Sequence, residues 1–270
     1  MMNRFLYLVM LKREGKKILG CSASFISYEW LITWVYPIII KSANIEKLPS
    51  CFPKAVKRVF GVAEGADLDL SYESYISAQF WGRLWSLVMS VYCNCAINAV
   101  IVQPSEQGYI VFPLSSPVSR SEIFCTQIAV LLTELVIVTG SAIVGVYAAA
   151  GRYTITISKW QYFRLGISAF SLFTTLSSYG LFMTMLVSPK EKALQISSSI
   201  TIFFYGLDAV ASLSDRYSKL RYFTPFGLYK PKEILQGLSL PLWGVVILSA
   251  VSLVSLFLAG LLYLQQDLAV

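Results

Sequence analysis

Between two long apolar segments of the chain stands SSPVSRSE, the stretch Ser115–Glu122. Within it, Ser119 and Glu122 have the S-x-x-E spacing of a capping box, in which each residue satisfies a backbone N–H group of the other. This spacing predicts that a helix starts at Ser119. The apolar residues that follow continue that helix, so the stretch marks where the chain re-enters an apolar environment.

The residues just upstream predict the end of the preceding helix. The segment 104–108 begins with a proline and ends with a glycine, which places that end near Val102. The connection that remains, residues 103–121, is too short to be a domain. We therefore expect a compact, structured loop between two helices.

The composition of the chain is that of an integral membrane protein. Of its 270 residues, 56% are hydrophobic and only 14% are charged, whereas soluble domains average about 25% charged residues. Helices are the expected secondary structure, because open sheet edges cannot be satisfied in lipid. We expect one all-α domain, residues 1–270, with six membrane spans at about 18–40, 75–102, 122–150, 161–187, 193–213 and 240–264.

The first seventeen residues suit a short helix that lies in the membrane interface. An apolar run, 5–11, precedes Lys12, Arg13, Lys16 and Lys17, and such a segment binds anionic cytoplasmic lipid. With this end inside, six spans place the C-terminus inside as well. The distribution of Lys and Arg points the other way, with eight in the inside segments and thirteen in the outside segments.

Several classes of chemistry are excluded by what the chain lacks. It contains no histidine, which excludes histidine-based triads, haem ligation and the usual zinc sites. Its five cysteines form no C-x-x-C pair. No G-x-x-x-x-G-K-[ST] phosphate loop is present, so we expect no cofactor in this chain and no ATP hydrolysis by that route.

Four motifs in a fixed order point to a family. The loop reads EQGY at 106–109 and LSSPVSR at 114–120, an aromatic FTPF follows at 223–226, and the chain closes with QQDL at 265–268. Together with six spans and an N-terminal interfacial helix, this order resembles the membrane permease of type-2 ABC exporters, with a likeness to the amphipathic-peptide exporter group. The chain departs from the family pattern at Tyr109, where a small residue is usual, and in the absence of a basic pair before Asp267.

The resemblance implies a fold, partners and a location. The fold would be that of a type-2 ABC exporter, in the bacterial plasma membrane, with both termini and the loop 103–121 in the cytoplasm. The working unit would be two permeases, as a homodimer or with a close paralogue, and two copies of a separate subunit that binds ATP and Mg²⁺. Beyond these subunits and the lipid bilayer we expect no nucleic-acid partner.

The resemblance also assigns the loop a role as the contact with the ATPase. Arg120 is its only basic residue and suits pairing with a partner carboxylate; the alternative is that it extends to anionic lipid. The segment 188–192 is a second, weaker contact candidate. The residues that we expect to couple to the ATPase are Glu106, Gly108, Pro117, Val118, Ser119, Arg120 and Glu122.

Charged and aromatic side chains within the spans are candidates for a substrate path. Glu29 and Arg83 lie at depths that allow an ion pair, whereas Glu134 has no obvious partner in the sequence. Intramembrane charges either line a path or pair to fix helix register, and the aromatics suit either a hydrophobic cargo or packing and interfacial anchoring. The candidates are Glu29, Trp30, Trp34, Trp81, Arg83, Trp85, Glu134 and Asp208.

These observations predict a transporter subunit. We expect an ATP-driven exporter permease, itself no enzyme, whose cargo is hydrophobic or amphipathic peptides or drugs. Lipid, polysaccharide or ions remain alternative cargoes. A membrane-embedded enzyme and a non-transporting sensor or assembly subunit remain alternative classes.

Overall fold

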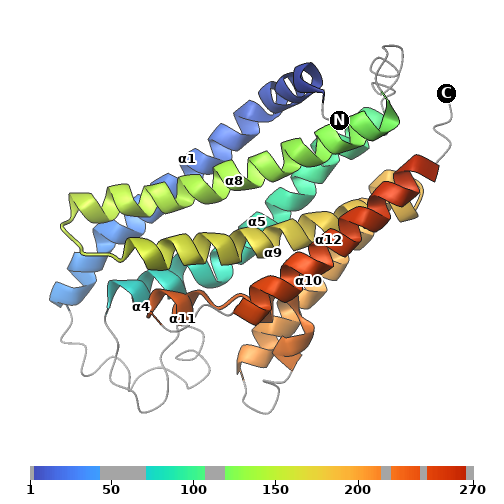
Figure 1. Ribbon diagram of the computed structural model, residues 1–270. Coiled ribbons are helices and arrows are strands. Elements are labelled where there is room, and N and C mark those ends of the chain that lie inside the picture. Colours follow the sequence, from blue (N-terminus) through green and yellow to red (C-terminus); the bar gives the residue numbers. More distant parts are fainter. Residues whose placement is uncertain (1–2, 43–70, 107–118, 214–219, 238–241, 266–270) are drawn as a thin grey trace.

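A computed structural model describes residues 3–42, 71–106, 119–213, 220–237 and 242–265. In these ranges the chain forms helices and no strand (Figure 1). Six helices are long and apolar enough to cross a membrane: Arg4–Ile38, Tyr72–Ser105, Arg120–Arg152, Lys159–Leu186, Lys190–Ser212 and Leu242–Gln265. The predicted all-α class with six apolar spans is confirmed, and each predicted span overlaps one of these helices.

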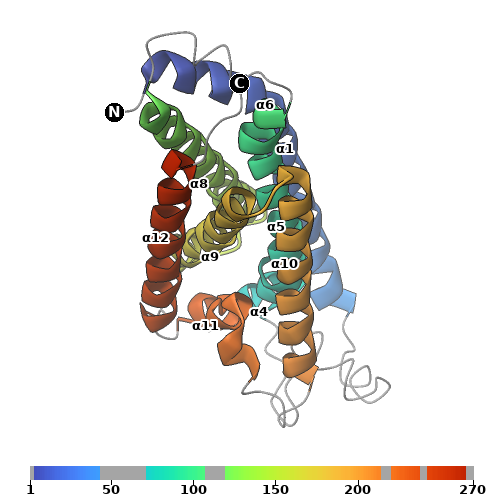
Figure 2. The ribbon, with the colours of Figure 1, turned by 90° about the vertical axis from the view of Figure 1, so that its right-hand side faces the viewer.

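The first helix, α1 (Arg4–Ser42), is continuous through the predicted boundary at residues 17 and 18. The interfacial helix expected for residues 1–17 is therefore not separate from the first span. Figure 2 shows that the first part of α1 runs across one end of the bundle before the helix turns to run along it. Lysines at the boundary do not end the helix, because lysine is a good helix former.

The second span is one helical rod built from five segments. They are α4 (Tyr72–Ile76), η2 (Ser77–Gly82), α5 (Arg83–Ile97), η3 (Asn98–Val102) and α6 (Gln103–Glu106). The segments η2 and η3 are wider, π-helical turns. The predicted helix end near Val102 is wrong, because the helix continues through Pro104 to Glu106.

A side chain from the third span explains how the helix continues through this proline. Pro104 has no N–H to donate to the carbonyl four residues earlier, that of Val100. The side-chain amide of Gln127 donates to this carbonyl instead, at 3.2 Å. Both residues that meet in this bond are buried, so Gln127 replaces a backbone hydrogen bond that water could not supply.

The remaining long helices are α8 (Arg120–Arg152), α9 (Lys159–Leu186), α10 (Lys190–Leu213) and α12 (Leu242–Gln265). The central one is α9, which contacts α5, α8, α10 and α12. Its hydroxyls bind α12: Ser171 donates to the Val245 carbonyl at 3.3 Å and Thr175 to the Leu248 carbonyl at 2.8 Å. Hydrogen bonds of this kind hold helices together where lipid offers no hydrophobic driving force.

Between α10 and α12 the chain folds back against the bundle. This segment contains η5 (Pro225–Leu228) and α11 (Pro231–Leu235). Phe226, Ile234 and Leu235 are buried, and α11 contacts α4, η2 and α9. The segment therefore closes the end of the bundle opposite to the start of α8.

The start of α1, the start of α8 and the end of α12 lie at one end of the bundle (Figures 1 and 2). This arrangement is the one expected for an even number of spans. It brings the capped start of α8 to the same end of the bundle as the start of α1 and the end of α12.

The hydrogen bond from Gln127 to the Val100 carbonyl beside Pro104 makes a prediction about stability. Gln127→Leu removes this side-chain donor from the buried Val100 carbonyl, which costs about 1–3 kcal/mol if the carbonyl stays buried and lowers the thermal unfolding temperature of the purified protein. Pro104→Ala restores a backbone N–H at this place. We therefore expect Gln127→Leu to cost less stability in the Pro104→Ala background, and strictly additive effects would contradict the account.

Candidate functional site

The start of α8 has the predicted cap. The hydroxyl oxygen of Ser119 accepts from the Glu122 backbone N–H at 3.2 Å, and the Ser119 N–H donates to the Glu122 carboxylate at 3.1 Å. Both halves of the capping box are present, and Arg120 follows it on the exposed surface. The start of α8 is therefore well fixed, with a basic side chain at its tip.

The other predicted coupling residues are only partly described. Glu106 is the last residue of α6, and only its backbone is described. Gly108, Pro117 and Val118 lie outside the described residues. Of the predicted contact residues, the structure thus places Ser119, Arg120 and Glu122 at the start of α8.

The first turns of α8 contact several other helices. The Asn3 N–H donates to the Thr126 hydroxyl at 3.2 Å, which ties α8 to the beginning of α1. Phe124 stacks on Tyr263 of α12, with ring centroids 4.9 Å apart. Together with the bond from Gln127 to η3, these contacts mean that displacement of the α8 start would reach three other spans.

The second predicted contact segment, residues 188–192, touches the same region. Lys190, the first residue of α10, donates from Nζ to the Ser105 hydroxyl at 2.7 Å. This bond connects the beginning of α10 to the end of the second span. The segment 188–192, predicted as a weaker contact candidate, therefore lies beside the end of α6.

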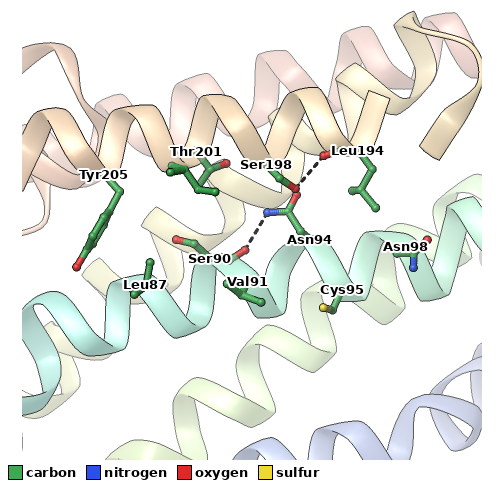
Figure 3. Close-up of a pocket in the computed structure, with 11 residues that line it drawn as sticks. Leu87, Ser90, Val91, Asn94, Cys95, Asn98, Leu194, Ser198, Thr201 and Tyr205 are labelled. Carbon is green, nitrogen blue, oxygen red and sulfur yellow. Dashed lines mark hydrogen bonds between the residues drawn. The ribbon is translucent and has the colours of Figure 1, made fainter. Parts of the chain in front are cut away.

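A groove of about 270 Å³ lies between α5 and α10 (Figure 3). Its volume is close to the lower end of the range for small-molecule sites. One part of its lining is apolar, with Leu87, Val91 and Ile202. The other part is polar and consists of Ser90, Asn94, Asn98, Ser198, Thr201 and Tyr205.

The polar groups of the groove differ in how well they are satisfied. The Asn94 amide donates to the Ser90 carbonyl at 2.9 Å, and Ser198 donates to the Leu194 carbonyl at 2.8 Å (Figure 3). Tyr205 donates to the Arg83 carbonyl at 3.3 Å. The side chain of Asn98 has no hydrogen-bond partner within the described ranges, so the groove offers amide groups to a ligand.

At the end of the groove near Tyr205, two predicted path residues have protein partners. Asp208 forms an ion pair with Arg221, whose Nε lies 3.1 Å from the carboxylate. Arg83 donates to the Ser212 hydroxyl. Asp208 thus fixes the chain after α10 against that helix, and Arg83 ties α5 to α10.

The predicted ion pair between Glu29 and Arg83 is wrong. The side chain of Arg83 is directed to Ser212 on α10, whereas Glu29 lies against Gly145 of α8. The π-helical turn η2 immediately precedes Arg83, and such a turn changes which face of the helix a following residue occupies. The sequence-based expectation compared the depths of the two residues along ideal α-helices and did not include the rotation that the π-helical turn introduces.

The four predicted tryptophans divide into two pairs. Trp81 and Trp85 are fully buried, with ring centroids 4.9 Å apart, and Trp85 also packs on Phe25 at 4.6 Å. Trp30 and Trp34 face outward and are 40% and 52% exposed. The buried pair therefore forms a packed aromatic core, and the exposed pair suits the lipid interface.

Glu134 has a partner that the sequence did not reveal. The Tyr92 hydroxyl on α5 donates to the Glu134 carboxylate at 3.2 Å. Glu134 itself is 2% exposed. The interpretation that this carboxylate has no partner is corrected by this bond between α5 and α8.

None of the eight predicted path residues lines the groove. The groove residues missed by the sequence analysis follow helical spacing. Polar residues recur every fourth position at Ser86, Ser90, Asn94 and Asn98, and at three- or four-residue steps at Ser198, Thr201, Tyr205, Asp208 and Ser212. Two such polar stripes in apolar spans are the signal that could have found the site.

Comparison with known proteins adds no family assignment: no protein-family model matches the chain and no curated protein matches it. The fold itself defines an all-helical protein with six helices long and apolar enough to cross a membrane. Its notable features are a mostly apolar groove that carries amide and hydroxyl groups between two of those helices, and a capped helix start at one end.

The groove supplies a matched pair of variants. Ser198 and Ser199 are neighbours on α10, and each donates to the carbonyl four residues earlier, at 2.8 and 2.9 Å. Only Ser198 lines the groove. We expect Ser198→Leu to fill the groove and to slow the reaction of Cys95, which also lines it, with a small maleimide in membranes. Ser199→Leu should leave this rate unchanged, and equal rates in both variants would contradict the groove.

Proposed function

We propose that the chain is the permease subunit of an ATP-driven exporter of the type-2 ABC class. In this proposal two copies form the substrate path, and a separate cytosolic subunit binds ATP and Mg²⁺. The chain itself contributes binding and movement rather than catalysis. The observation that carries the proposal is the groove between α5 and α10, where hydroxyl and amide groups stand within a mostly apolar lining.

The depth of the groove supports this function. Asn94 and Asn98 lie eleven and seven residues before Ser105, which is about 16 and 10 Å along a helix. Amides at such depth are costly against lipid chains. A groove with this lining therefore needs a covering surface, and in our proposal it faces the second copy across the path.

The mixed lining of the groove favours an amphipathic cargo. Apolar side chains such as Val91 and Ile202 would take the hydrophobic part of a peptide or drug, whereas the amides of Asn94 and Asn98 would take its polar groups. A purely ionic cargo would have no charged lining residue to meet, because no member of the described lining carries a charge. We therefore propose hydrophobic or amphipathic peptides or drugs as the cargo class.

Coupling to the ATPase is proposed to occur at the start of α8. The capping box fixes this helix start, and its first turns bind α1, η3 and α12. A push on Arg120 by a partner would therefore move several spans together. This is the mechanical property that a coupling segment requires.

Charge reversal at Arg120 tests this proposal. In Arg120→Glu the new acidic group lies in the first turn of α8, where it favours the helix, so the helix start should remain intact. We expect affinity purification from the native host membranes to recover an ATP-hydrolysing subunit with the wild-type chain and several-fold less with Arg120→Glu.

Arg152→Glu is the matched control, because Arg152 lies exposed at the opposite end of the same helix. It should recover the ATP-hydrolysing subunit at the wild-type level. Equal recovery with Arg120→Glu, or no ATPase with the wild type, would refute the proposed coupling.

A further inference from the structure

The buried face of α1 is unusually polar for a membrane helix. Side chains at three- or four-residue steps point into the bundle, and the opposite face carries exposed Leu31 and Trp34. The buried set is Glu14, Ile18, Ser22, Phe25, Glu29, Ile32 and Thr33. The helix therefore turns its acidic groups toward protein and its apolar groups outward, as expected in lipid.

Glu29 is the most enclosed of these acidic residues. It is 0% exposed, and neither carboxyl oxygen has a hydrogen-bond partner among the described residues. The helix α8 approaches it at Gly145, where a Cβ atom would overlap the Glu29 carboxyl and lie 3.3 Å from the Ile26 Cα. The carboxyl thus occupies the space that a side chain on α8 would need.

Other buried acidic residues have partners, and Glu29 differs from them. Glu14 lies 2.9 Å from the Lys17 ammonium and 3.8 Å from Arg13. Glu134 accepts from Tyr92. For Glu29, no ion pair is present within the described ranges.

Among the described residues, the groups near Glu29 supply no positive charge. From α4 the titratable neighbour is Tyr72, bonded to Thr33 at 2.8 Å. From α9 the neighbour is Tyr162, which packs on Tyr147 of α8. These tyrosines carry no positive charge, so the described neighbours do not compensate an ionised Glu29.

An unpaired carboxylate in such a place is too costly to persist. On the side of the carboxyl that faces α8, the tight approach at Gly145 leaves no room for a metal ion or an amine. In addition, no group of three or more His, Cys, Asp or Glu residues suited to a metal occurs in the described part of the chain. The cation that fits is a proton.

We propose that Glu29 is a proton-binding site at the contact between α1 and α8, and that the closed contact holds it as the neutral acid. Opening of the contact exposes the carboxyl to water and releases the proton. Proton binding therefore stabilises the closed packing of α1 on α8. This inference does not rest on the cargo or on the ATPase.

The sign of the pH dependence follows from linkage. The closed form holds one proton more than a form in which Glu29 reaches water, where a glutamate titrates near about pH 4.3. Stability therefore falls as the pH rises above that value, because the unfolded or open form binds fewer protons. The Glu29→Gln variant, a neutral side chain of the same shape, lacks this contribution.

The test uses the full-length protein purified in lipid nanodiscs. We expect the wild-type unfolding temperature to fall between about pH 6 and pH 9, and this fall to be reduced in Glu29→Gln. Glu134→Gln removes another buried acid. Its unfolding temperature should still show the share of the pH-dependent decrease that is missing in Glu29→Gln. The infrared difference between wild type and Glu29→Gln at pH 7 should contain the C=O band of a carboxylic acid.

Three results would overturn the proposal. One is a carboxylate band in place of the acid band in that difference spectrum. The second is a pH dependence of Glu29→Gln equal to that of the wild type. The third is failure of Glu29→Gln to fold, because a neutral isostere should replace a neutral native group without loss.

Discussion

In the interior of a bilayer no water completes the hydrogen bonds that helices leave unmade, and the packing of this protein follows from that constraint. The contact between Gln127 and the Val100 carbonyl is its clearest expression, because a proline in the second span removes a backbone donor that a side chain of the third span replaces. In the same way, the hydroxyls of Ser171 and Thr175 donate hydrogen bonds to backbone carbonyls of α12. Polar bonds of this kind thus join neighbouring helices beside the buried apolar core that includes Trp81 and Trp85.

Two candidate functional sites contain polar groups that the described residues leave without a hydrogen-bond partner. The groove between α5 and α10 presents the side chain of Asn98, which has no hydrogen-bond partner among the described residues, so in our proposal a second surface or a ligand satisfies it. Glu29 is a different exception, because it is enclosed rather than exposed and lacks even a donor. The first exception suits a cargo with polar and apolar parts, and the second suits a proton. Both follow from the same cost of unsatisfied polar groups in a medium without water.

Sequence alone predicted what depends on local chemistry. The apolar runs located the six long helices, and the S-x-x-E spacing located the start of α8 at Ser119. It did not predict the continuation of the helix through Pro104, because the compensating donor is distant in sequence. It also paired Glu29 with Arg83, since a depth count assumes ideal helices and ignores the π-helical turn η2. The groove was not predicted, because the serine, threonine and asparagine residues in the apolar spans were not compared at helical spacing.

The central claim is that the groove between α5 and α10 faces the second copy across the substrate path. A native cysteine tests it directly, because Cys95 lines the groove, while Cys125 is exposed on α8. In membranes that contain a variant with Cys95 as its sole cysteine, a short bifunctional thiol reagent should give a covalent dimer. A variant with Cys125 alone should give little. A dimer from Cys125 but none from Cys95 would contradict the account.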